Sequence, residues 1–204
     1  RPETETPPAP RKTPEPPTTG SRARGVFGRD QDVEKLARLV AERPLVSVYG
    51  LPAVGKSTLG EELLHTKEHA GIRYHHVRIH EVTTFKRLFQ QLAPALGAGN
   101  DPADERFAVM SRFSVLEKWA KKAEPTLIHL ERAHLLLDDG GQRLREPEVG
   151  ALLAAIADKC GDVRVVLEGR RAPGKEALPA DVHETMRVGG LGSDDLADVF
   201  RTPP

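Results

Sequence analysis

Apolar residues along this chain gather in short runs, separated by longer stretches in which they recur at helical spacing. The first run, residues 45–49, reads Leu-Val-Ser-Val-Tyr and precedes a glycine-rich turn. Its length and apolar content predict a buried strand. Similar runs at residues 77–79, 127–130 and 163–167, and a weaker one at 186–188, predict four more strands.

Helical spacing of apolar residues fills the intervals between these strands. We expect helices from a cap at Asp30 to Arg43-Pro44, from the glycine turn through about His65, over 85–92 behind Thr83 or Thr84, over 107–119, over 149–156, and after Ser193. Strands that alternate with helices indicate a mostly parallel sheet covered on both faces. The expected fold class is therefore α/β, a three-layer sandwich.

The first 22 residues differ in character from the rest of the chain. They are crowded with proline, threonine and acidic residues and have almost no large apolar side chains. Such a segment buries too little surface to offset its ordering entropy, so we expect a disordered linker, either a free tail or a tether to an upstream domain. We expect one folded domain over residues 23–201 and a short tail at 202–204. The start at Arg1 and the abrupt end suggest a fragment of a longer protein.

Charge and hydropathy favour no membrane and no nucleic acid. Lys plus Arg and Asp plus Glu both total 30, so the formal net charge is zero and no overall field attracts either partner. No apolar run approaches the roughly 20 residues that a membrane-spanning helix requires. A single cysteine, Cys160, excludes an internal disulfide and fits a reducing compartment. We therefore expect a cytoplasmic protein.

Histidines are numerous, but their pattern does not predict a metal site. His65 and His69 are one helical turn apart, and three more lie around the second expected strand. Zinc sites normally need three or four converging ligands, and this chain offers neither paired cysteines nor close carboxylates. We expect solvated or core histidines, and we give His129 on the third strand no catalytic role.

The glycine-rich turn carries the clearest chemical signal. Residues 50–57 read Gly-Leu-Pro-Ala-Val-Gly-Lys-Ser, which matches the phosphate-binding pattern G-x-x-x-x-G-K-[ST] between a strand and a helix. Glycines let successive amides turn toward phosphate oxygens, and the helix start adds positive potential. Lysine would neutralise the β and γ phosphates, serine would bind Mg²⁺, and the next threonine would reach the α phosphate. The expected nucleotide contacts are Gly50, Ala53, Val54, Gly55, Lys56, Ser57 and Thr58.

With this P-loop in place, the chain resembles the nucleotide-binding domains of STAND-class signal-transduction ATPases, a class that includes NB-ARC switch proteins. The second motif that carries the resemblance is Phe27-Gly28-Arg29-Asp30, about twenty residues before the P-loop. The resemblance implies a P-loop NTPase fold in which Phe27 and Arg29 lie near the base and sugar. A helix cap with an exposed arginine explains the Gly-Arg pair equally well.

In this class the third strand ends in an acidic residue that holds magnesium, usually followed by a second acid or amide. Here Glu131 stands at that position and Arg132 replaces its partner. A glutamate still reaches the metal through water, but arginine cannot act as a general base at neutral pH. A competing alignment takes Asp138 and Asp139 as the acids. We prefer Glu131, because the two aspartates precede Gly140-Gly141 and predict a turn.

The fourth strand in this class ends in a Thr-Ser-Arg-like sequence that senses the γ phosphate. Here Glu168-Gly169-Arg170-Arg171 follows Leu167, so the hydroxyl residues are missing while Arg170 keeps the arginine position. Arg170 would stabilise phosphate charge, or it is a surface charge beside Arg171. The altered residues imply slow hydrolysis.

The resemblance implies an ATP or ADP switch with magnesium, in a multidomain signalling or antiviral defence protein. An upstream effector, a downstream sensor and a nucleotide-dependent homo-oligomer are its implied partners. Two alternatives stay open. One is a competent ATPase of the AAA-like group, in which Glu131 or Asp138 prepares water and an arginine from a neighbour completes the site. The other is a degenerate scaffold that binds no nucleotide.

Overall fold

The computed structural model describes residues 28–66, 71–98 and 109–191. Several expectations lie outside these ranges: the linker at 1–22, the tail at 202–204, the role of Phe27, the start of the helix at Phe107, and the closing helix after Ser193. The side chains of residues 109–114 also lie outside the description.

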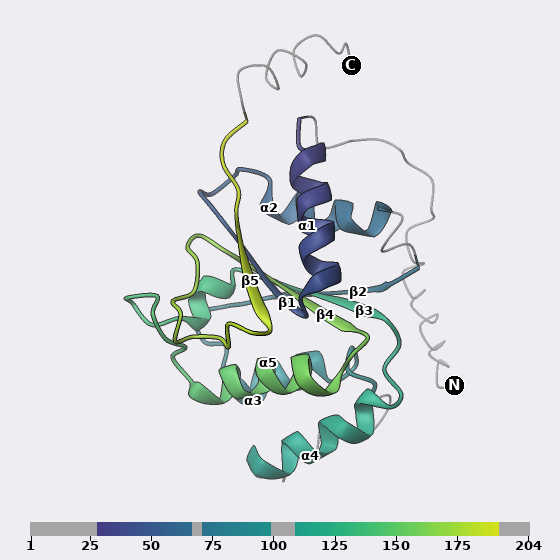
Figure 1. Cartoon of the computed structure of the whole chain (residues 1–204). Helices are drawn as coiled ribbons and strands as arrows, with labels where there is room; N and C mark the ends of the chain where they lie inside the picture. Colours follow the sequence, from purple (N-terminus) through teal and green to yellow (C-terminus); the bar gives the residue numbers. More distant parts are fainter. Residues whose placement is uncertain (1–27, 67–70, 99–108, 192–204) are drawn as a thin grey trace, which may run out of the picture.

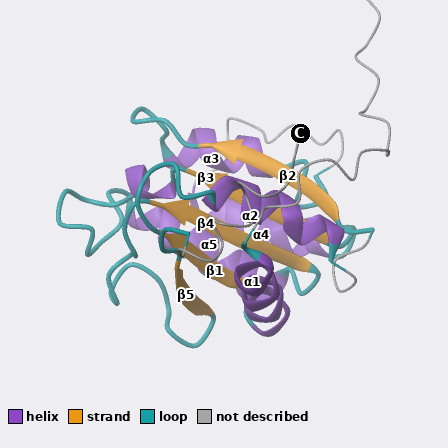
Figure 2. Ribbon diagram, turned by 90° about the horizontal axis from the view of Figure 1, so that it is seen from above, coloured by secondary structure: helices purple, strands orange, loops and turns teal. Residues whose placement is uncertain are grey.

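A five-stranded parallel sheet forms the centre of the domain (Figure 2). Its strands are β1 Leu45–Tyr49, β2 Arg73–Arg78, β3 Thr126–Glu131, β4 Val163–Gly169 and β5 His183–Arg187. Their order across the sheet is β2-β3-β4-β1-β5, so β4 is inserted between β3 and β1. The predicted α/β fold with a parallel sheet is confirmed.

Helices cover both faces of the sheet and make three layers (Figure 1). On one face lie α1 Asp30–Glu42 and α2 Lys56–Glu62, which is extended by the 3-10 turn η1 Leu63–His65. On the other face lie α3 Phe85–Leu92 and α5 Pro147–Lys159, with α4 Val109–Ala120 packed beyond them (Figure 1).

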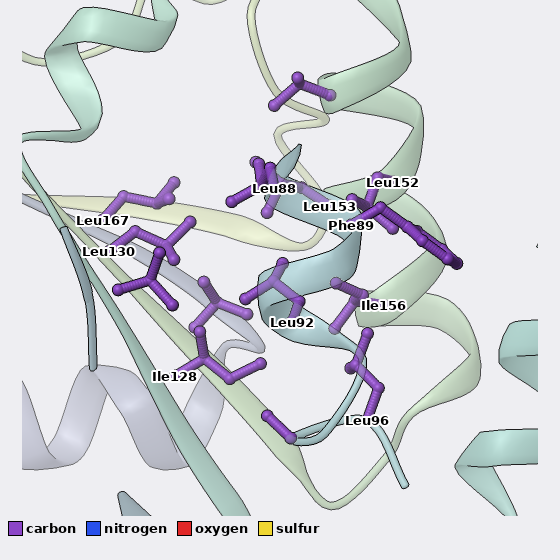
Figure 3. Packing of buried hydrophobic residues seen from close by; sticks show 14 of the residues in the cluster. Leu88, Phe89, Leu92, Leu96, Ile128, Leu130, Leu152, Leu153, Ile156 and Leu167 are labelled. Atoms are coloured by element: carbon purple, nitrogen blue, oxygen red, sulfur yellow. The ribbon is translucent and has the colours of Figure 1, made fainter. Parts of the chain in front are cut away.

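Two apolar clusters hold the layers together because the strands are buried on both faces. Figure 3 shows part of the larger cluster, in which side chains of α3 and α5 pack on the sheet. Its labelled members are Leu88, Phe89, Leu92, Leu96, Ile128, Leu130, Leu152, Leu153, Ile156 and Leu167. The smaller cluster joins α1 and α2 to the opposite face through Leu36, Val40, Val46, Leu59, Leu63, Leu127 and Val166.

Local details differ from the sequence expectations at three points. The N-cap of α1 is Arg29, which makes no side-chain capping hydrogen bond. Asp30, the expected cap, is instead the first residue of the helix. β5 occupies residues 183–187, earlier than the expected 186–188. A short 3-10 helix, η3 Ala133–Leu136, follows β3, so the apolar residues before Asp138 are not a strand of the sheet.

Candidate functional site

The P-loop joins the carboxyl end of β1 to the start of α2. Gly55 has φ +86° at the N-cap of α2 and Ala53 has φ +60°, so two of its residues adopt left-handed backbone conformations. A Cβ at Gly50 would lie 2.3 Å from the carbonyl oxygen of Val188, which leaves glycine as the only residue that fits there. The loop is therefore shaped by backbone conformations that its glycines allow.

Lys56 lies inside this loop. Its Nζ donates hydrogen bonds to the carbonyl oxygens of Gly50, at 3.1 Å, and Leu51, at 2.7 Å, and the residue is 7% exposed. Burial lowers the pKa of the Lys56 ammonium below its usual value, the charge of Glu168 opposes that shift, and the charge of Arg170 adds to it. The ammonium is thus placed at the loop, next to one anionic and one cationic side chain.

Arg29 ties the start of α1 to the P-loop. Its guanidinium donates to the carbonyl oxygens of Val54, at 2.9 Å, and Gly189, at 2.8 Å, and pairs with Asp32 at 2.8 Å. The residue is only 5% exposed, so it is not the exposed arginine of a simple helix cap. A cavity of about 410 Å³ adjoins it and is lined by Gly28, Arg29, Asp30, Gln31, Asp32, Gly189 and Gly190.

Glu168, at the end of β4, is a buried acid beside the P-loop and is 8% exposed. His129 Nε2 lies 3.1 Å from its Oε2, and Ser57 and Lys56 also stabilise its charged form. Burial by itself raises the pKa of the Glu168 carboxyl. The hydrogen bonds from His129 and Ser57, with the charges of His129 and Lys56, outweigh burial and leave that pKa below its ordinary value.

His129 continues this chain of contacts toward β2. Its Nδ1 lies 2.6 Å from the Tyr74 hydroxyl, and burial together with the charges of Glu61, Glu168 and Glu131 raises the pKa of that hydroxyl. The Tyr74 hydroxyl therefore keeps its proton. Because an ionised carboxylate only accepts hydrogen bonds, the Nε2 hydrogen of His129 is donated to Glu168. The His129 side chain lies beneath α2, where Gly60 leaves room for the imidazole ring.

Glu131, the acid expected to hold magnesium, ends β3 and contacts β2. Its carboxylate lies 3.3 Å from His76 Nε2 and 3.5 Å from Arg78 Nε. Its neighbour Arg132 has φ +63° and begins η3. The alternative acids Asp138 and Asp139 lie in a turn, where Asp138 accepts from the amide of Gln142 at 2.9 Å.

Cationic groups gather near the end of β4. Arg170 is exposed and has no hydrogen bond or ion pair among the described residues, whereas Arg171 donates to the carbonyl oxygens of Asp138 and Asp139. Burial and the charges of Arg170, Arg132, Arg171 and Lys56 lower the pKa of His134. The Arg170 charge also acts on Lys56, so the two predicted phosphate-binding cations are close enough to interact.

Sequence reasoning missed the buried polar group formed by Tyr74, His129 and Glu168. A histidine and a glutamate within otherwise apolar strands were a signal that could have been read, because buried polar side chains require partners. Their pairing depends on β4 lying next to β3, which the linear pattern does not reveal.

The fold and the loop define the class as a P-loop NTPase domain. The model of the family "Novel STAND NTPase 6" (nSTAND6) matches residues 26–173 of this chain. The chain therefore belongs to the nSTAND6 family of STAND NTPases, and it contains a nucleotide-binding module of the P-loop ATPase type. No curated protein matches it significantly.

Solved structures of P-loop ATPases share the fold. A STAND protein with a tetratricopeptide repeat sensor from Pyrococcus horikoshii superposes with a TM-score of 0.62 at 15% identity, over 89% of this chain and 26% of its own. Cdc6p from Pyrobaculum aerophilum gives 0.63 at 18% identity, over 90% and 51%. A Drosophila ORC structure bound to AT-rich DNA and Cdc6 gives 0.55 at 12%, over 82% and 57%. This chain thus spans only part of each.

No three His, Cys, Asp or Glu side chains in residues 28–66, 71–98 and 109–191 converge as a metal-binding group. Within the same residues, no helix is both long and apolar enough to cross a bilayer.

Proposed function

We propose that this domain is a nucleotide-dependent switch that binds ATP or ADP with magnesium and hydrolyses ATP slowly. The observation that carries the proposal is the P-loop itself, with the Lys56 ammonium held inside it at the carboxyl end of β1. Open parallel sheets bind ligands at this edge. Mg²⁺ prefers oxygen ligands, and the Ser57 hydroxyl beside a buried carboxylate supplies that chemistry.

The cavity beside Arg29 supports a place for the base and sugar. It lies between the start of α1 and Gly189-Gly190, and Arg29 connects it to the P-loop through Val54. In the proposed complex the phosphates lie along the loop and the base end occupies this cavity. Arg170, whose charge already acts on Lys56, would face the γ phosphate.

A switch also needs a link from the nucleotide to the rest of the protein. Arg29 binds Val54 of the loop and Gly189 after β5 through one guanidinium group. A change in the conformation of the loop on nucleotide binding would therefore alter the contact of Arg29 with Gly189, where the chain leaves the sheet after β5. We propose that this contact lets the nucleotide control docking of effector or sensor domains and, through it, oligomerisation.

Slow hydrolysis follows from the residues around the site. Arg132 stands where a second acid would prepare water, and it cannot accept a proton at neutral pH. A competent ATPase would require another base. Steady-state phosphate release at the rate of an ordinary ATPase would contradict the slow-switch proposal.

Lys56→Ala is the direct test of nucleotide binding. Removing the ammonium should weaken binding of a fluorescent ATP or ADP analogue by about 10- to 100-fold, because a charge-assisted contact to phosphate contributes about 1.5–3 kcal/mol. Lys122→Ala, in the exposed turn between α4 and the amino end of β3, is the control and should bind as the wild type does. Equal affinities in the folded Lys56 variant and the control would refute the proposal.

A further inference from the structure

We infer that His76, on the edge strand β2, is a positioning residue for Glu131, the acid at the end of β3 that is expected to hold magnesium. Its imidazole fixes one oxygen of the carboxylate, and through that contact His76 acts on the metal site without touching the metal. The inference rests on the proposed binding of nucleotide with magnesium, and it adds the residue that orients the acid.

Glu131 lies on the face of the sheet that α2 covers. Side chains alternate between the two faces of a strand, so Leu127, His129 and Glu131 share one face. Leu127 packs in the cluster with α1 and α2, and His129 lies against Gly60 of α2. Ser57 is the second residue of the same helix. The carboxylate is therefore at the carboxyl edge of the sheet on the side of the P-loop helix, and it has the oxygen ligands that Mg²⁺ prefers.

The described contacts of the Glu131 carboxylate come from β2, the strand at the edge of the sheet (Figure 2). β2 and β3 pair in register, with Arg78 opposite Glu131. His76 Nε2 lies 3.3 Å from Oε2 of Glu131, and Arg78 Nε lies 3.5 Å from Oε1. Each carboxylate oxygen has two lone pairs, so one contact with a nitrogen leaves a lone pair for a metal ion or for its water.

The imidazole of His76 is itself held by two neighbouring rings. It lies parallel to the Tyr74 ring, with an interplanar angle of 3° and centroids 6.2 Å apart, and the His129 ring is 5.3 Å away. These separations are within the range of favourable ring contacts. The Arg78 side chain, in contrast, is 58% exposed. We therefore assign the positioning role to His76, whose ring has neighbours that fix its place.

The same arrangement occurs one strand farther into the sheet. His129 on β3 contacts Glu168 on β4 at 3.1 Å, as His76 on β2 contacts Glu131 on β3. In the strand ladders His76 is opposite His129, and His129 is opposite Val166, so each histidine is diagonal to an acid two residues farther along the next strand. Outer contacts of this kind orient the carboxylates that bind metals. The sheet thus places an imidazole beside both acids.

The test compares nucleotide affinity in Mg²⁺ and in EDTA, using a fluorescent ADP analogue and the complete chain at one pH. The measured ratio is the dissociation constant in EDTA divided by that in Mg²⁺, which reports the metal and not hydrolysis. We expect His76→Leu to lower this ratio by about 10-fold, and His76→Gln, which keeps an N–H donor, to retain most of it. His65→Leu, the same change at an exposed histidine in the 3-10 turn after α2, is the control and should leave the ratio unchanged.

Glu131→Gln tests whether His76 acts through the acid. We expect this variant to lower the ratio by about 10-fold or more, and addition of His76→Leu to lower it no further, because residues in one network do not give additive effects. Losses that multiply in the double variant would overturn the inference. So would an unchanged ratio in His76→Leu, equal losses in the leucine and glutamine variants, or a higher ratio in His76→Leu, which would mean that the contact withholds the carboxylate from the metal.

Affinity in EDTA separates the metal site from the fold and from nucleotide binding. The His76 side chain is 43% exposed on an edge strand, so its variants should fold and should bind the analogue in EDTA as the wild type does. An equal loss of affinity in both conditions would assign His76 to the fold and overturn the inference. A wild type that binds equally well in EDTA would overturn the inference but leave nucleotide binding intact. A folded wild type that binds no nucleotide in either condition would overturn the proposed function, and this inference with it.

Discussion

At the scale of single residues, the site depends on how tightly Gly60 and His129 fit together. A Cβ at Gly60 would lie 2.8 Å from Cε1 and 2.9 Å from Nδ1 of His129. The ring has little freedom to move, because Tyr74 and Glu168 hold its two nitrogens. Glycine within a helix costs stability relative to alanine, so its presence in α2 is explained by the ring that it accommodates.

Gly60→Ala should therefore destabilise the domain although alanine is the better helix former. Overpacking and disturbed hydrogen bonds at His129 cost more than the helix gains, and we expect the free energy of unfolding to fall by about 1–3 kcal/mol. Urea denaturation followed by circular dichroism measures this change. Gly161→Ala, where a Cβ would meet no atom within 4 Å, is the control and should stay within about 0.5 kcal/mol of the wild type. A stabilised Gly60→Ala would contradict the packing argument.

At the scale of elements, α3 is held at its start and along its apolar face. Thr84 caps its start by accepting from the Arg87 amide at 3.4 Å, and Glu146, the N-cap of α5, accepts from the Phe85 amide at 2.9 Å. Its apolar side chains then pack with those of α5 on the sheet (Figure 3). The sheet face opposite α1 and α2 is thus stabilised by α3 and α5. The hydrogen bond between Glu146 and the Phe85 amide joins the starts of these two helices.

Leu88→Ala tests how much this helix contributes. Leu88 is fully buried in the cluster of α3 and α5, and we expect truncation to lower the free energy of unfolding by about 2–5 kcal/mol. Val82→Ala is the matched control, because Val82 is 72% exposed just before the helix and its truncation should change stability by less than about 0.5 kcal/mol. Similar urea midpoints for the two variants would show that α3 does not pack as described.

At the scale of the whole molecule, half-buried neutral histidines make stability depend on pH. Burial lowers the pKa of His183 below its ordinary 6.5, against the opposing charge of Glu184, and Nε2 of His183 lies 2.8 Å from the Ser47 hydroxyl. His134 is lowered in the same direction by burial and neighbouring cations. Above about pH 6.5 these histidines are neutral in both the folded and the unfolded protein. Below that pH the unfolded chain binds protons more readily, because its histidines keep the ordinary pKa of 6.5.

The free energy of unfolding should therefore fall as the pH drops from about 7.5 to about 5.5. The carboxyl of Glu168 contributes nothing in this range, because its pKa lies below its ordinary value of 4.5 and its stabilisation is lost only at lower pH. His183→Gln keeps a hydrogen-bonding group but does not titrate, so its urea midpoint should change less over the same interval. An identical pH slope in this variant would exclude His183 as a source of the effect.

Much of the fold could be read from local patterns. β1, β3 and β4 are continuous apolar runs because parallel strands are buried on both faces, and the predicted runs at 45–49, 127–130 and 163–167 all lie within them. The edge strand β5 was placed less well. Its exposed residues, such as Glu184 and Thr185, weaken the apolar pattern on which the prediction relied.

The sequence by itself determined the class of this protein, since the spacing of two glycines, a lysine and a serine between a strand and a helix specifies a phosphate-binding loop. Only the tertiary structure decided which acid lies beside that loop. Glu131 and Glu168 both end apolar strands, but β4 lies next to β1 and β3 does not. Contacts between strands depend on their order in the sheet, and local patterns of apolar residues carry no information about that order.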